Sequence, residues 1–149
     1  LSTNITGTQN TALGDYASYQ NVSATSTIAI GYSAAEGAAA YNAQGYTAIG
    51  YQSGVSFATG ADYNTLLGYK AGNLITTGAN NVIVGAASTG SNDNLTTGSG
   101  NIKIGYNISF PSATANNQLN IGNIIFGTGV SGSGSTIAGN IGIGTTSPG

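Results

Sequence analysis

A short pattern of apolar and small residues recurs along the whole chain. Each copy consists of an apolar residue or Thr, then any residue, then an apolar residue, then Gly. The eight copies occupy residues 11–14, 28–31, 47–50, 65–68, 82–85, 102–105, 119–122 and 141–144. Their glycines lie 17, 19, 18, 17, 20, 17 and 22 residues apart. Because a unit of this length cannot bury its apolar side chains alone, the repeat predicts stacked copies of one structural unit.

The first and third positions of each copy are predicted to form the core. Side chains alternate between the two faces of a strand, so these two positions point the same way. The residues predicted for this core ladder are Leu13, Ile28, Ile30, Ile49, Leu67, Val82, Val84, Ile102, Ile104, Leu119, Ile121, Ile141 and Ile143. We therefore expect an all-β fold, a repetitive β-roll or β-solenoid of about eight rungs of roughly 18 residues.

The second position of each copy is then predicted to face outward. It is apolar in the first five copies, at Ala12, Ala29, Ala48, Leu66 and Ile83. In the last three copies it is Lys103, Asn120 and Gly142. An outward apolar stripe on a thin solenoid needs cover, and we interpret it as a contact between chains. The alternative is that the turns of the chain itself cover the stripe. The change in polarity predicts a change of packing near residue 100.

A glycine ends each copy and is predicted to turn a corner of the coil, because glycine adopts backbone conformations that other residues avoid. The predicted corner glycines are Gly14, Gly31, Gly50, Gly68, Gly85, Gly105, Gly122 and Gly144. A tyrosine follows this glycine at Tyr32, Tyr51 and Tyr69. These rings are predicted to stack as an aromatic ladder, with contact to a sugar or another surface as the alternative.

The repeat is regular over residues 1–100 and less regular over residues 101–149, which we treat as two parts. Pro111 interrupts one unit, because proline cannot donate to a strand ladder. Residues 127–135 are rich in Gly and Ser and are predicted to be a flexible loop or a close chain crossing. The chain begins at Leu1 and contains no Met, so we expect a processed product or a piece of a longer protein.

The composition narrows the possible partners. Charged residues make up 4% of the chain, against roughly 25% in a typical globular domain. Lys70 and Lys103 are the only basic residues, so little affinity for nucleic acid is expected. Cysteine is absent, which excludes disulfides and thiolate metal sites. No apolar run approaches the roughly 18 residues of a membrane span. We expect no cofactor, no metal site and no membrane insertion.

Catalytic chemistry has little support in the sequence. There is no His, and the four carboxylates share no catalytic spacing. These carboxylates are Asp15, Glu36, Asp62 and Asp93. Rung stacking could bring Asp15 and Asp62 together, but a glycosidase needs two carboxylates at a defined separation. We expect no catalytic residue in this chain.

Three segments carry a resemblance to known families. They are residues 10–14 (Asn-Thr-Ala-Leu-Gly), 46–51 (Tyr-Thr-Ala-Ile-Gly-Tyr) and 64–69 (Asn-Thr-Leu-Leu-Gly-Tyr). They resemble the head repeats of trimeric autotransporter adhesins and the repeat region of phage tail fibres and similar bacterial surface proteins. Residues 142–148 are similar to the segment that often precedes a self-cleaving chaperone domain in tail-fibre proteins. The repeat here is longer and less regular than that of the adhesin heads.

The resemblance implies a parallel homotrimer of left-handed β-rolls or interleaved strands, exposed outside a cell or on a virion. We expect a structural fibre or adhesin segment that self-associates and presents a region binding a cell-surface glycan or protein receptor. One alternative is a monomeric ice-binding β-solenoid with a flat array of Thr. The comparable array of Thr11, Thr47 and Thr65 skips Ile28 and is expected to point inward. A second alternative is the non-catalytic part of a carbohydrate-degrading tailspike.

Overall fold

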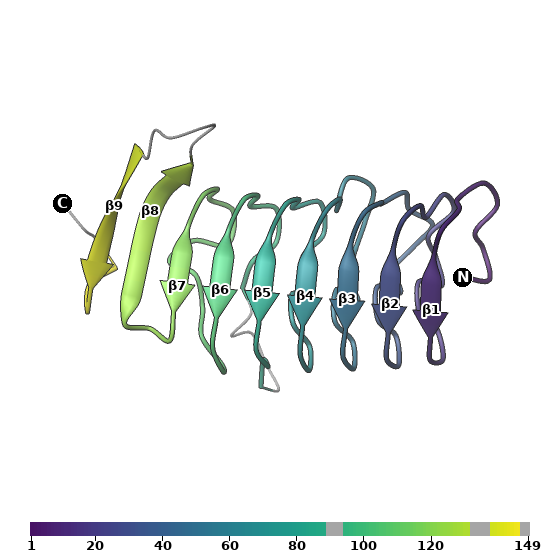
Figure 1. Ribbon diagram of the computed structural model, residues 1–149, viewed down its shortest axis with the longest axis horizontal. Helices are drawn as coiled ribbons and strands as arrows, with labels where there is room; N and C mark the ends of the chain where they lie inside the picture. The colour runs from purple at the N-terminus through teal and green to yellow at the C-terminus, as the bar shows by residue number, and fades with distance from the viewer. Residues whose placement is uncertain (89–93, 132–137, 147–149) are drawn as a thin grey trace.

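The computed structural model describes residues 1–88, 94–131 and 138–146. Within these residues the chain has no helix and forms nine strands, which join in one sheet in chain order (Figure 1). The strands are β1 (Thr11–Leu13), β2 (Ile28–Ile30), β3 (Thr47–Ile49), β4 (Thr65–Leu67), β5 (Val82–Val84), β6 (Ile102–Ile104), β7 (Leu119–Ile121), β8 (Ile125–Ser131) and β9 (Ala138–Ile143). The predicted all-β solenoid is confirmed.

The first seven strands are parallel and keep one register. Each residue of a strand pairs with the residue at the same position of the next copy, as Thr11 does with Ile28. The connections between these strands make six turns of the coil rather than the predicted eight rungs. Within the chain, β5 and β6 pair in the same parallel register across residue 100, so the coil continues there, and a change of packing between chains stays a prediction.

A hairpin of β8 and β9 ends the stack. The chain reverses directly after β7, so Ile121 pairs with Ile125 in an antiparallel ladder. Ile125 in turn pairs with Ile143 of β9. The eighth copy of the sequence pattern therefore lies in an antiparallel strand, which explains why its spacing is the longest. Residues 127–131 of the predicted loop belong to β8, and residues 132–135 lie outside the described part of the chain.

The predicted inward and outward positions are reversed. The second positions Ala29, Ala48, Leu66, Ile83, Lys103 and Asn120 are all buried, so they face the interior. Only Ala12, in the first rung, is exposed as predicted. The predicted core residues Leu13, Ile28, Leu67, Val82, Ile102, Ile104, Ile141 and Ile143 are exposed, while Ile30, Ile49, Val84, Leu119 and Ile121 are half-buried. Neither the core ladder nor the outward stripe is correct.

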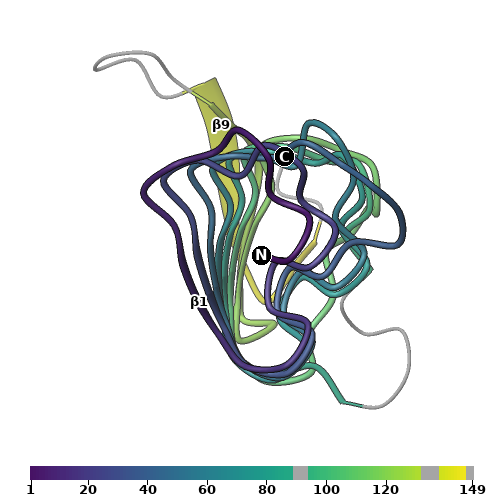
Figure 2. The same cartoon turned by 90° about the vertical axis from the view of Figure 1, so that its right-hand side faces the viewer.

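The reversal follows from what fits inside the coil. Buried side chains of the connecting segments, among them Phe57, Ile75 and Leu95, fill the interior. The space left beneath the first strands suits small residues such as Ala29 and Ala48. The larger aliphatic pairs of the strands then point away. Figure 2, which looks along the coil, shows the strands forming one side of the coil and the connecting segments closing the others.

A ladder of amide side chains runs through the interior, one residue before each of the strands β4 to β7. Its oxygen atoms join successive turns. The Oδ1 atom of Asn64 accepts hydrogen bonds from the backbone N and Nδ2 of Asn81, at 2.9 and 3.0 Å. Asn81 accepts the same two bonds from Asn101, and Asn101 accepts two from Gln118. Because buried polar groups are costly when unpaired, this ladder both stabilises the stack and sets its register.

The first six corner glycines behave as predicted. Gly14, Gly31, Gly50, Gly68, Gly85 and Gly105 have φ angles between 124° and 147°. A Cβ added to Gly50 would lie 2.2 Å from the carbonyl oxygen of Gly68, so the corners pack too closely for any side chain. Gly122 and Gly144 differ, with φ angles of 60° and 74° and nothing within 4 Å. They belong to the β7–β8 turn and the end of β9, so their assignment as corners is wrong.

Candidate functional site

The outer face of the strands is the most unusual surface of the molecule. It consists of the first and third residues of β1 to β7, which form two parallel columns; we call it the apolar face. Three of the fourteen positions are Thr and the other eleven are Leu, Ile or Val. Leu13 is 66% exposed and Leu67 is 47% exposed. The face therefore leaves in contact with solvent the side chains that a folded chain ordinarily buries.

The apolar face continues onto the hairpin. The pairing of Ile121 with Ile125 and of Ile125 with Ile143 extends the third-position column across β8 and β9. Ile141 of β9 is 63% exposed and Ile143 is 79% exposed. The hairpin therefore changes the strand direction while the third-position column continues, and in the first-position column Gly127 lies between Leu119 and Ile141.

No residue of the apolar face carries a charge. The one charged residue of the strands, Lys103, points inward and is 4% exposed. Its Nζ atom lies 5.7 Å from the centre of the Phe110 ring. Two identical copies of the face could therefore meet without electrostatic repulsion.

A tyrosine ladder follows one edge of the apolar face, where the strands end. The rings of Tyr32 and Tyr51 stack with centroids 5.5 Å apart, and those of Tyr51 and Tyr69 stack at 5.2 Å. Tyr16 meets Tyr32 edge-on at 5.9 Å. The Lys70 Nζ atom lies 5.5 Å from the centre of the Tyr69 ring. The predicted aromatic ladder is confirmed, and contact of these rings with a sugar or surface stays a prediction.

A second face, which the sequence reasoning did not find, adjoins the first. It is formed by the segments that precede the strands, and we call it the polar face. Its side chains are Thr6, Thr8, Ser23, Thr25, Asn42, Gln44, Thr59, Asp62, Thr77, Thr97, Ser99, Thr114 and Asn116. Buried small residues such as Ala43 and Gly78 lie between them. The recurring Thr-Gly pairs were the signal in the sequence that could have revealed this face.

Side chains of the polar face connect successive turns. Asp62 Oδ1 accepts a hydrogen bond from the backbone N–H of Gln44 at 2.9 Å. In the same way, Ser99 Oγ accepts from the N–H of Ala79 at 3.0 Å. Thr59 Oγ1 accepts from the N–H of Asn42 at 3.1 Å. These bonds give polar partners to backbone groups that the strand ladder does not reach.

A cavity of about 290 Å³ opens on the polar face. It is lined by Ser23, Asn42, Ala43, Gln44, Thr59, Gly60 and Asp62. Tyr63 follows Asp62 in the chain and its ring lies against Gly45, where an added Cβ would come within 2.4 Å of the ring. Gly45 follows the lining residue Gln44 in the chain. The exposed ring of Tyr63 therefore lies near the polar cavity.

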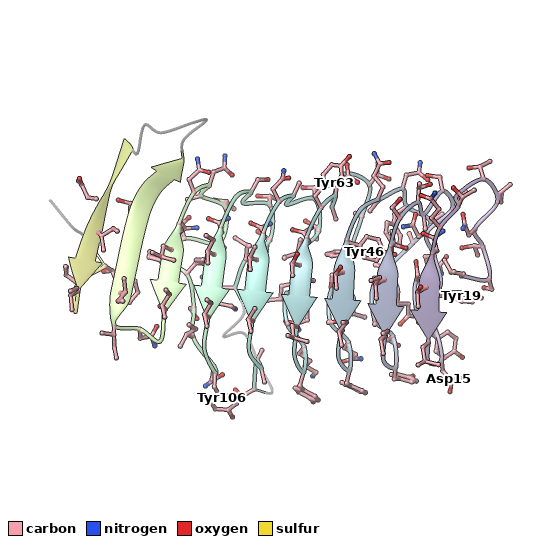
Figure 3. The ribbon with its side chains drawn as sticks, viewed as in Figure 1. Asp15, Tyr19, Tyr46, Tyr63 and Tyr106 are labelled. Carbon is pink, nitrogen blue, oxygen red and sulfur yellow. The ribbon has the colours of Figure 1, made fainter. Side chains whose placement is uncertain are left out.

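The carboxylates do not come together. Asp15 lies in the corner after β1, whereas Asp62 precedes β4 at the opposite end of the strands. Figure 3 shows this separation, with Asp15 at the lower edge and Tyr63, the neighbour of Asp62, at the upper edge. Glu36 lies in the connection after β2, and Asp93 falls outside the described residues. Stacking therefore does not create the pair that Asp15 and Asp62 were considered to form.

The described part of the chain has neither a metal-binding cluster nor a membrane-spanning helix. It contains no group of three or more His, Cys, Asp or Glu side chains arranged to hold a metal ion. It also has no helix of the length and apolar character that crossing a membrane requires. Comparisons with protein families, curated protein sequences and solved structures found no match.

Proposed function

We propose that this chain is a structural segment of an extracellular fibre or adhesin, carried on a cell surface or a virion. It self-associates as a parallel homotrimer, and the assembled shaft presents a region that binds a receptor. The apolar face supports this proposal most strongly, because it carries no charge and its third-position column continues across all nine described strands. The repeat resembles those of trimeric adhesin heads and tail fibres, which agrees with this role.

Covering the apolar face would contribute a free energy of the same order as the cost of association. Full burial of an aliphatic side chain contributes about 1.5–3 kcal/mol. Since most of the eleven aliphatic residues are only partly exposed, covering the face is worth on the order of 10 kcal/mol per chain. Association costs about 4–15 kcal/mol in lost freedom. The two quantities are comparable, so an assembly that covers the whole face is favoured over one that covers part of it.

The shape of the face favours three copies over two. The face is two side chains wide, and the strands that carry it are short. Two such strips packed face to face would leave both margins open to water. Three strips around a common axis place each strip against two neighbours, so both columns are covered. A parallel arrangement keeps the rungs of the three copies level, as cyclic symmetry requires.

The mass of the intact chain in solution tests this proposal. Light scattering coupled to size exclusion is expected to give three times the 14.6 kDa of one chain. Ile104→Lys places a charge on the apolar face and is expected to give monomers with an unchanged β circular dichroism spectrum. Thr97→Lys places the same charge on the polar face and is expected to remain trimeric. A monomeric native protein would overturn the proposal.

Ice binding is a second candidate, because one observation favours it. Thr11, Thr47 and Thr65 were expected to point inward, but they lie on the outward apolar face. Against this, the third-position column contains no Thr at all. A thermal hysteresis assay on the native protein separates the two candidates. The fibre proposal predicts no hysteresis, and clear hysteresis from a monomer would favour ice binding.

A further inference from the structure

We propose that the cavity on the polar face is a binding subsite for a single neutral sugar ring. Its residues come from three successive turns of one chain. Ser23 precedes β2, Asn42 and Gln44 precede β3, and Thr59 and Asp62 precede β4. The subsite deepens the proposed function, because it names neutral sugars as the class of receptor. This interpretation as a receptor site rests on the proposed function. The cavity itself is complete within one chain.

The size of the cavity limits the ligand. Small-molecule sites typically measure about 300–1,000 Å³. At about 290 Å³, this cavity lies just below that range and suits one ring rather than an extended ligand. It is also open at the surface, so a terminal residue of a longer glycan could enter it.

The unused hydrogen-bonding groups of the cavity match hydroxyl groups. The side chain of Gln44 is exposed to solvent. Asn42 uses its Oδ1 atom to accept from Ser23 Oγ at 3.0 Å, which leaves its NH₂ group for a ligand. Asp62 uses Oδ1 to accept from the Gln44 N–H, which leaves its second carboxylate oxygen. A hydroxyl both donates and accepts, so neighbouring hydroxyls of a sugar can pair with this mixed set.

The charge of the site excludes other ligand classes. The lining holds one carboxylate and no cation, so phosphate and other anions would be repelled. Metal ions such as Ca²⁺ need about six to eight oxygen ligands, and a single carboxylate is too few charged ligands to hold one. An apolar ligand would leave the amides and the carboxylate of the cavity without partners.

Tyr63 follows the lining residue Asp62 and, without lining the cavity itself, offers an aromatic surface beside it. Its side chain is 55% exposed, and it seats against Gly45, a residue without a Cβ. An aromatic ring with a polar tip can pack against the C–H face of a sugar while its hydroxyl stays in water. The residues that correspond to Tyr63 in the later turns are Asn80, Gly100 and Asn117. The later turns also lack the carboxylate of Asp62, so the combination occurs once along the described polar face.

Saturation-transfer NMR tests the subsite on the intact chain. The probes are glucose, galactose, mannose and N-acetylglucosamine, each titrated at millimolar concentration. At least one sugar is expected to receive saturation from the native protein. Gln44→Ala and Asp62→Asn are each expected to weaken that binding by on the order of tenfold, the effect of losing one hydrogen bond to a ligand. Asparagine at 62 retains an acceptor for the Gln44 N–H, so the turn should stay intact.

Thr97→Ala is the matched control, because it removes a hydroxyl from the same face two turns beyond the cavity. It is expected to bind as the native chain does. The absence of a signal for all four sugars would overturn the subsite, and so would equal binding by Gln44→Ala. The monomeric Ile104→Lys variant is expected to retain binding. A trimer that binds no sugar refutes the subsite alone, whereas a native monomer that binds sugar refutes the fibre assembly alone.

Discussion

The two sides of the same short strands differ in burial, and large aliphatic residues that a folded protein usually buries lie on the exposed side. Facing the interior are buried residues that range from the small Ala29 and the amide-bearing Asn120 to the large Leu66. Facing outward are pairs of large aliphatic residues, of which Leu67 is one. The coil is held together by its buried hydrophobic core, by close backbone packing at the corners and by the amide ladder. The outward aliphatic pairs form an apolar surface that the chain itself leaves exposed.

Two adjacent leucines give the strongest test of this difference. Leu66 is 0% exposed and Leu67 is 47% exposed. Leu66→Ala leaves a cavity inside the coil and is expected to lower the free energy of unfolding by about 2–5 kcal/mol. That loss should not depend on protein concentration. Leu67→Ala is expected to weaken assembly instead, so its effect should grow as the protein is diluted.

Urea unfolding at several protein concentrations measures both effects. Equal, concentration-independent losses for Leu66→Ala and Leu67→Ala would contradict the distinction between the two sides of the strand.

The amide ladder provides a second test, directed at the interior. Asn81 accepts two hydrogen bonds from Asn101 and donates to Asn64 and to the carbonyl of Gly98. Asn81→Leu leaves these buried groups without partners and is expected to cost about 2–3 kcal/mol. The exposed neighbour Asn80 has a φ angle of 58°, which glycine accepts readily. Asn80→Gly is therefore the control and is expected to unfold at nearly the native denaturant concentration.

The pH dependence of stability tests the burial of Tyr41. Burial raises the pKa of its hydroxyl well above the ordinary value, and the hydroxyl donates to the carbonyl oxygen of Ala35. Because the folded chain holds this proton more tightly than the unfolded chain, stability is intact below about pH 10. Above it, stability falls by up to about 1.4 kcal/mol per pH unit. In Tyr41→Phe this contribution is absent, so unfolding midpoints between pH 10 and 11 should fall less steeply. Equal slopes would mean that Tyr41 is not buried as described.

The tyrosine ladder provides a further test, at the edge between the two sides of the strands. Tyr51 stacks on both Tyr32 and Tyr69, and such pairs contribute about 0.5–1.5 kcal/mol each beyond the area that they bury. Tyr51→Ala is therefore expected to cost about 1–3 kcal/mol of coil stability. Tyr106 is 70% exposed, and Tyr106→Ala should cost less. Thermal unfolding of the two variants compares them, and a larger loss at Tyr106 would argue against a stacked ladder.

Much of the fold could be predicted from the sequence. The first three residues of each of the first seven copies coincide with β1 to β7, because the repeat, the glycine corners and the strands share one period. The inward side could not be predicted from alternation alone, since a period of two fits either face. Asn64 and Asn81 each lie one residue before a strand. Their side chains therefore point to the same face as the second residue of the strand, which is buried. Recognising these amides as a buried ladder would have identified the inward side of the strands.

The end of the coil and the polar cavity were harder to predict. The copy at residues 141–144 looks like the others, yet its backbone pairs antiparallel because β8 forms a hairpin with β9. The cavity has no motif of its own. It depends on how turns of unequal length bring Asn42 and Asp62 together, and that requires three-dimensional coordinates.

A single engineered cysteine tests the central claim most directly, since the chain has no native cysteine. In a parallel trimer built on the apolar face, Leu67→Cys places the same thiol of neighbouring chains side by side near the axis. Mild oxidation is then expected to give a disulfide-linked dimer band on a non-reducing gel. Thr97→Cys on the polar face should give none. Cross-linking through Cys at position 97 but not at position 67 would show that the chains do not meet through the apolar face.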